Sequence, residues 1–173
     1  IPSVAPSPSP AAPTTKRIQA TSINGVASEF TWSGEVPTGW AAEAVPAIEA
    51  INVYDPKAPG TTNLEKSQLF IRHFEANSFL TLSTVTIHEL TNRTVAGRPA
   101  VAYDIEKLAG VADFPNQPGW RNQRHRVTDV RVSDANPSVF YVFATRPDLD
   151  QVIFDHFLAT LSGGATPDTM LGS

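Results

Sequence analysis

The sequence predicts an α+β domain: a mostly antiparallel sheet of about six to eight strands, packed by one amphipathic C-terminal helix. Three observations predict this class. Short apolar–polar alternations of strand length recur along the chain, and clusters of Pro, Gly, Asn and Asp separate them. The clearest helical spacing of apolar residues comes last in the chain. An α/β/α sandwich is the alternative architecture.

The N-terminal half is divided into short strands by turn-forming residues. Asn24-Gly25 is a dipeptide typical of tight hairpin turns, and Pro46 interrupts an otherwise apolar stretch. We therefore expect strand structure over 18–32, two short strands over 41–54, a loop over 55–66 and a strand over 69–74.

The second half continues the same pattern up to residue 144. Gly97 lies between two apolar runs and marks the turn of a hairpin over 94–105. We further expect a helical turn or loop over 77–82, a strand from Val85, a long loop over 107–119, and strands over 126–132 and 139–144. Loops of this length often carry function, which draws attention to 107–119.

The final element is a helix that begins near Thr145, whose hydroxyl is a capping group, followed by Pro147 and acidic residues. We interpret Asp148 and Asp150 as acids of the first helical turn rather than as a catalytic pair. The predicted core-facing side chains are Leu149, Val152, Ile153, Phe157 and Leu161, and Gly163-Gly164 ends the helix.

Composition divides the chain into three parts. Residues 1–16 hold five prolines and one charge, at Lys16, and we expect a disordered, extended tether there. A single globular domain over 17–163 and a flexible tail over 164–173 complete the chain. Pro/Ser/Ala-rich segments are typical immediately after a signal anchor or lipoprotein signal, so we expect an extracytoplasmic protein, either secreted or membrane-anchored. A stretch inside a longer cytosolic protein is the alternative.

Charge and cysteine content narrow the function classes. The net charge of -4 does not favour nucleic acid as a partner, and the absence of cysteine excludes thiol nucleophiles and Cys-based metal sites. No apolar run reaches membrane-spanning length. We expect a monomer that contacts a membrane only through a segment preceding the chain.

A basic–aromatic stretch after the long loop is the strongest candidate binding site. Arginines in forked hydrogen bonds, beside an aromatic ring, suit a carboxylate, a phosphate, a glycan or an acidic protein partner. The alternative is a solvated strand edge whose charges discourage strand pairing. The predicted ligand-binding residues are Trp120, Arg121, Arg124, His125, Arg126 and Arg131.

Catalytic and metal-binding interpretations are the minor alternatives. His73 with Glu75, and His88 with Glu89, would form a metal site only if their strands converged. His125 and Asp129 share one strand face and are the candidate pair of a small hydrolase. No nucleophile elbow or phosphate-binding loop accompanies them. We therefore assign no catalytic residue, metal or cofactor.

Three stretches resemble the PsbP-like fold family, which includes the extrinsic photosystem II subunit and a Ran-binding protein of the same superfamily. They are the turn Val36-Pro37-Thr38-Gly39-Trp40, the hairpin over 94–103, and the aromatic strand 140–143 that runs toward the last helix. The resemblance covers most of 27–162. It implies an antiparallel sheet sandwiched between helices and a non-catalytic accessory or binding role.

Together these observations predict a non-enzymatic, extracytoplasmic accessory or binding domain. We expect it to recognise a protein partner or an anionic ligand near residues 107–126. A small hydrolase with a His/Asp site and a structural envelope module are the alternatives.

Overall fold

The computed structural model describes residues 14–79 and 83–163, which form two antiparallel sheets and one α-helix. The strands are β1 (Thr15–Gln19), β2 (Trp32–Pro37), β3 (Ala41–Val45), β4 (Ala50–Tyr54), β5 (Ser67–Ala76), β6 (Val85–Val95), β7 (Arg98–Lys107), β8 (His125–Arg131), β9 (Ser138–Thr145) and β10 (Ser162–Gly163). The helix is α1 (Gln151–Ala159), and short 3₁₀ helices cover Ala20–Ser22, Pro46–Ile48 and Gly119–Asn122.

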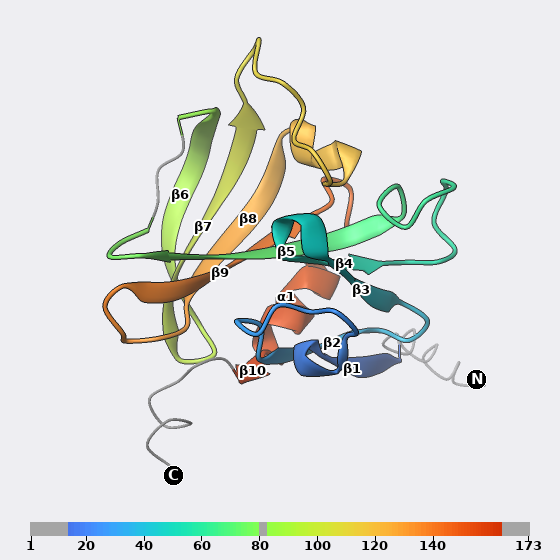
Figure 1. The fold of residues 1–173 in the computed structure, drawn as a ribbon, viewed down its shortest axis with the longest axis horizontal. Helices are drawn as coiled ribbons and strands as arrows, with labels where there is room; N and C mark the ends of the chain where they lie inside the picture. Colours follow the sequence, from blue (N-terminus) through green and yellow to red (C-terminus); the bar gives the residue numbers. More distant parts are fainter. Residues whose placement is uncertain (1–13, 80–82, 164–173) are drawn as a thin grey trace, which may run out of the picture.

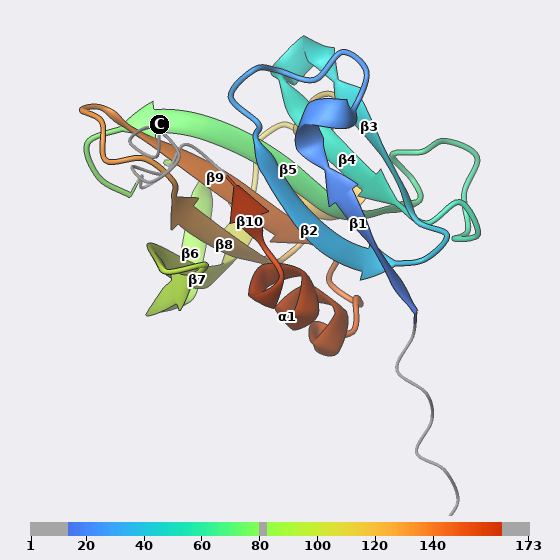
Figure 2. The ribbon, with the colours of Figure 1, turned by 90° about the horizontal axis from the view of Figure 1, so that it is seen from below.

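The larger sheet has seven strands in the order β3-β4-β5-β9-β8-β7-β6, and its twist is visible in Figure 1. The smaller sheet has the order β1-β2-β10 and lies beside α1 (Figure 2). Of the two architectures that the sequence leaves open, the described residues form the antiparallel sheet packed by one helix. The predicted α+β class is therefore confirmed.

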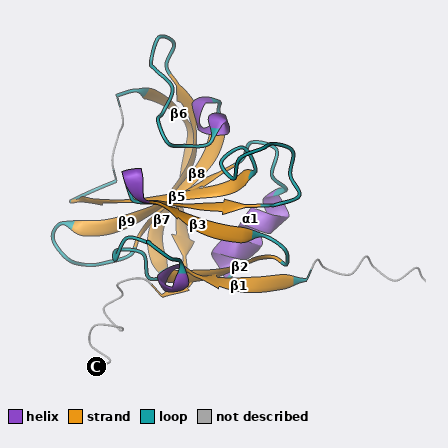
Figure 3. Ribbon diagram, turned by 45° about the vertical axis from the view of Figure 1, so that its right-hand side comes forward, coloured by secondary structure: helices purple, strands orange, loops and turns teal. Residues whose placement is uncertain are grey.

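The first face of the large sheet carries the main core. Alternate side chains of β4, β5, β8 and β9 meet side chains of β2 and α1, because successive residues of a strand point to opposite faces. Trp32 of β2 lies between two aromatic rings, with centroids 6.0 Å from Phe143 and 5.4 Å from Phe157. Figure 3 shows α1 between this face and the small sheet.

The second face of the large sheet has its own smaller core, which positions the candidate site. Phe70, Tyr103, Ile105 and Val127 lie on this face, and the residues that follow β7 fold back over it. Trp120, in the 3₁₀ helix Gly119–Asn122, is buried there and donates its indole Nε1–H to the carbonyl of Ser67 at 3.2 Å.

Several local predictions are confirmed by the strand pairing. β3 and β4 pair as two short strands separated by the 3₁₀ helix that begins at Pro46. β6 and β7 form the expected hairpin, and its turn residues Ala96 and Gly97 have φ of 52° and 75°. These left-handed conformations match the tight turn whose twist suits paired strands.

The N-terminal predictions need correction. Residues 20–31 are not strand; β1 reaches β2 through a 3₁₀ helix and a loop, in which Gly25 has a φ of 78°. Thr15 and Lys16, assigned to the tether by composition, pair with Pro37 and Val36 in the small sheet. Residues 1–13 and 164–173, with the predicted tether and tail, lie outside the described residues, as do 80–82 of the segment expected to be a turn or loop.

The helix begins later than predicted. Thr145 is the last residue of β9, and the N-cap is Asp150, whose carboxylate accepts the Val152 N–H at 3.0 Å. Val152 is 70% exposed, so its predicted place in the core is wrong. The buried helical side chains are those of Phe154, Phe157 and Leu158. Leu149 precedes the helix, so its spacing to later residues does not define the buried face.

Candidate functional site: a cavity on the second face of the large sheet

The structure does not bring the six predicted ligand-binding residues to one surface. Arg121 and His125 turn inward with Trp120 and are 7% and 2% exposed. Arg124 and Arg126 are more exposed and lie together elsewhere. Arg131 is separate from both groups: its Nε donates to Ser138 Oγ at 2.9 Å and steadies the turn before β9.

Arg124 and Arg126 are held by carboxylates rather than free. Their Nε atoms bind the two oxygens of Asp104 at 3.1 and 3.2 Å, and Glu89 lies within 3.9 Å of both guanidinium groups. They border a polar groove of about 490 Å³, whose lining also includes Arg93 and Arg146. The acids neutralise much of the positive charge that the sequence suggests here.

Arg121 and His125 form a buried hydrogen-bonded pair. The Arg121 Nη1 lies 2.6 Å from His125 Nε2, and its Nε donates to Gln117 Oε1 at 3.0 Å. Because a guanidinium nitrogen only donates, His125 Nε2 accepts, and its Nδ1–H donates to the Gln123 carbonyl at 2.8 Å. Burial and the Arg121 charge lower the pKa of His125 to about 3, so the imidazole is neutral.

Asp129 is the second buried titratable group of this region. It is 2% exposed, and its Oδ2 accepts the Tyr103 hydroxyl at 2.7 Å. Burial raises the pKa of Asp129 to about 7, although the Tyr103 hydrogen bond and the Arg121 charge act in the opposite direction. Burial also raises the pKa of Tyr103. Asp129 Oδ1 is buried and has no hydrogen-bond partner.

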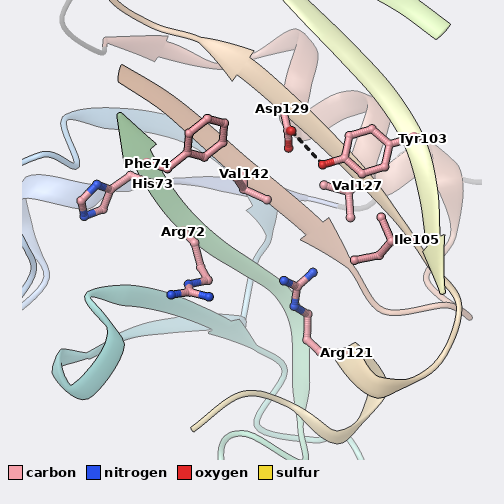
Figure 4. Close-up of a pocket in the computed structure, with 9 residues that line it drawn as sticks. All are labelled: Arg72, His73, Phe74, Tyr103, Ile105, Arg121, Val127, Asp129 and Val142. Carbon is pink, nitrogen blue, oxygen red and sulfur yellow. Dashed lines mark hydrogen bonds between the residues drawn. The ribbon is translucent and has the colours of Figure 1, made fainter. Parts of the chain in front are cut away.

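Arg121, Tyr103 and Asp129 line a cavity of about 200 Å³ between β5, β7, β8, β9 and the 3₁₀ helix Gly119–Asn122 (Figure 4). Its apolar walls are the side chains of Phe74, Ile105, Val127 and Val142. Figure 4 shows the guanidinium groups of Arg72 and Arg121 reaching the cavity from different elements, and the His73 ring directed away from it.

The two arginines are close enough to influence each other. Burial lowers the pKa of Arg121 to about 10, and the positive charge of Arg72 contributes to that shift. Burial also lowers the pKa of Arg72, whose Nε is buried without a hydrogen-bond partner. Two cations therefore face a mostly apolar space.

The catalytic and metal-binding hypotheses find no matching geometry. His125 and Asp129 do not pair, because both ring nitrogens of His125 are already bonded, to Arg121 and to the Gln123 carbonyl. His73 lies on β5 and His88 on β6, and the strands β9, β8 and β7 lie between them in the sheet. Among the described residues no three His, Asp or Glu side chains are grouped as metal ligands require.

Sequence reasoning missed Arg72 and Tyr103 and assigned Asp129 a different role. Each is a polar residue inside an apolar strand segment, such as Leu69-Phe70-Ile71-Arg72 or Val127-Thr128-Asp129-Val130. Because buried polar groups need partners, such interruptions are a usable signal. The signal does not reveal which of them meet across the sheet.

Comparisons with known proteins give a weak likeness to a solved structure and no family assignment. No family model matches the chain, and no curated protein does. The solution structure of cyanobacterial PsbP (CyanoP) from Synechocystis sp. PCC 6803 is similar, with a TM-score of 0.45 and 11% identity. The match is a weak likeness that covers 87% of this chain and 93% of that one. No helix of the described part is long and apolar enough to cross a membrane.

Proposed function

We propose that this chain is a non-enzymatic binding domain and that the cavity beside Arg121 receives a small ligand with an apolar part. One observation carries the proposal: Arg72 and Asp129 line the same cavity, and each holds a buried polar atom, Nε and Oδ1 respectively, without a hydrogen-bond partner. Folded proteins rarely leave buried polar atoms unpaired, and such atoms call for an explanation. A ligand that bonds to them supplies one.

Binding is favoured over catalysis by the state of the candidate catalytic groups. The neutral His125 uses Nε2 to accept from Arg121, so no free lone pair remains for a general base. No serine or threonine side chain lines the cavity in the described part of the chain. Burial raises the pKa of Tyr103, which removes its phenolate as a nucleophile at neutral pH.

The proposal departs from the sequence prediction in where the ligand sits. Arg121 belongs to the predicted 107–126 region and lines the cavity, whereas Arg124 and Arg126 lie at the polar groove. The carboxylates of Asp104 and Glu89 already neutralise those two. An exposed arginine in such a pair contributes little to an external ligand.

A cavity-filling variant tests the site. Val142→Phe places a larger side chain against the cavity, and Val152→Phe makes the same change at an exposed helix position. Small aliphatic acids, alcohols and amides at millimolar concentration are screened by thermal unfolding, because a ligand of the folded state raises Tm by mass action. We expect at least one compound to raise the Tm of wild type and V152F and to leave that of V142F unchanged.

Two results contradict the proposal. Either no compound raises the Tm of the wild type, or the same shift persists in a folded V142F. Circular dichroism confirms that V142F is folded before the comparison is made. The extracytoplasmic location stays a separate prediction from composition, which fractionation of the source cells against cytosolic and envelope markers tests.

A further inference from the structure

We propose that the cavity binds the carboxylate end of a small aliphatic acid, held by Arg72, Arg121 and the free oxygen of Asp129. The inference rests on the proposed function, since it names the ligand class of the same cavity. It is supported by three features: the donors left unused, the form of Asp129, and the apolar walls.

The first feature is a pair of guanidinium groups with unused donors. Arg72 Nε has no hydrogen-bond partner, and Arg121 uses Nε and Nη1 for Gln117 and His125. The Arg121 Nη2 has no hydrogen-bond partner among the described residues. Two neighbouring cations in an apolar space repel each other, and an anion between them relieves that repulsion while accepting charge-assisted hydrogen bonds.

The second feature is the orientation of the Asp129–Tyr103 pair. Tyr103 donates to Oδ2, so a proton on Asp129 resides on Oδ1, the oxygen without a partner. With its pKa near 7, Asp129 is protonated below neutral pH and donates from Oδ1. The guanidinium groups and the protonated Oδ1 that line the cavity then offer a ligand donors. A carboxylate, which only accepts, matches this set, whereas an ammonium group does not.

The surroundings of Asp129 contain no competing acid among the described lining residues. β9 contributes Val142 on this face and no titratable group. The charged or titratable side chains that face Asp129 are Tyr103 from β7, Arg121 from the 3₁₀ helix, Arg72 from β5, and His125 and Arg131 on the same face of β8.

The third feature is the apolar remainder of the cavity. Phe74, Ile105, Val127 and Val142 form walls that a hydrated inorganic anion leaves uncovered. A volume of about 200 Å³ corresponds to roughly seven non-hydrogen atoms at ~30 Å³ each. Since two of these atoms are the carboxylate oxygens, the ligand is an aliphatic acid of about five or six carbons in all, counting the carboxylate carbon.

Hexanoate, hexanol and hexylammonium are probes that differ only in the polar end. Titration calorimetry at pH 6 and pH 8 compares them on the full chain. We expect hexanoate to bind at pH 6 at least about tenfold more tightly than either isostere, because a cavity of unpaired donors rejects groups that leave them unpaired. We expect its affinity to fall about tenfold at pH 8, since the protonated fraction of Asp129 falls by that factor.

Variants assign the effect to the cavity. Asp129→Asn keeps a donor at this position and cannot ionise, so hexanoate binding becomes equal at pH 6 and pH 8. Arg72→Gln loses hexanoate affinity by at least about tenfold. The matched control is Arg126→Gln, the same substitution at the polar groove on the other face of β8, which leaves the affinity unchanged. If R72Q does not fold, the pH response of D129N decides the question.

The outcomes separate this inference from the proposed function. If hexanol binds as tightly as hexanoate and V142F abolishes both, the cavity is a binding site but its carboxylate specificity is refuted. If no probe binds the wild type, the carboxylate inference is refuted, and a wider screen without a Tm shift then refutes the proposed function. If R126Q loses affinity while a folded R72Q keeps it, the ligand site lies in the groove and the inference is overturned.

Discussion

His125 and Asp129 are buried on the same face of β8, and their pKa values are displaced in opposite directions. Burial and the Arg121 charge lower the pKa of His125 from 6.5 to about 3, while burial raises that of Asp129 from 3.8 to about 7. In the native state His125 is therefore neutral and Asp129 protonated across the mildly acidic range. Their contributions to the pH dependence of stability oppose each other.

Replacing either residue exposes the contribution of the other. Between about pH 4 and 6.5 His125 carries a proton in the unfolded chain but not in the native state, so this residue makes stability rise with pH. Over the same range Asp129 keeps its proton in the native state and loses it on unfolding, so this residue makes stability fall with pH. Relative to wild type, we expect Asp129→Asn to gain stability with rising pH and His125→Gln to lose it. Each slope is on the order of 1 kcal/mol per pH unit. Urea unfolding at several pH values measures this, and three parallel curves would contradict it.

Among the elements, the contact of α1 with β2 depends on the lack of a side chain at Gly34. A Cβ built there lies 2.6 Å from Phe157 Cε2, far inside van der Waals contact. The Phe157 ring packs over β2 beside Trp32, and Phe143 closes the group from β9. The helix thus sits on the small sheet only because that strand has a glycine at the crossing point.

Gly34→Ala tests this contact. We expect it to lower the free energy of unfolding by about 1–3 kcal/mol, because an added methyl group in a filled core forces neighbours to shift. Gly119→Ala is the control, since its Cβ meets no atom within 4 Å and its φ is ordinary. Urea unfolding compares the two, and equal stability of G34A and wild type would show that α1 moves freely on β2.

Across the molecule, the small sheet joins the two ends of the described chain. β1 and β10 both pair with β2, so Gln19 and Ser162 flank the same residue, Ser33. Arg17 strengthens this closure, because its Nη1 donates to Ser33 Oγ and to the Thr160 carbonyl, each at 3.0 Å. Ile18 of β1 also belongs to the main core.

Two truncations test the predicted boundary between the tether and the domain. If residues 1–13 belong to the predicted tether, we expect their removal to change the free energy of unfolding by less than about 0.5 kcal/mol, as for changes away from packed side chains. Removal of residues 1–19 deletes β1 and the buried Ile18, which alone costs about 2 kcal/mol or more. Urea unfolding measures both, and a large loss with the shorter truncation would contradict the predicted domain boundary.

Local sequence patterns are enough to place most of the strand ends. The hairpin around Gly97, the break at Pro46 and the loop after Lys107 can be predicted from turn residues and alternation, which are local properties. The same patterns place Arg121 within the predicted binding region 107–126. Alternation even implies that Arg124 and Arg126 leave the strand on the face opposite to His125.

Which of these faces encloses a cavity depends on the tertiary structure. Arg72, Tyr103 and Asp129 come from three different strands, and no local pattern shows that they meet. The same holds for the carboxylates of Asp104 and Glu89 that neutralise the predicted basic patch. Local patterns fix backbone conformation through neighbours in the chain, whereas the burial and pKa of a charged side chain depend on neighbours in space.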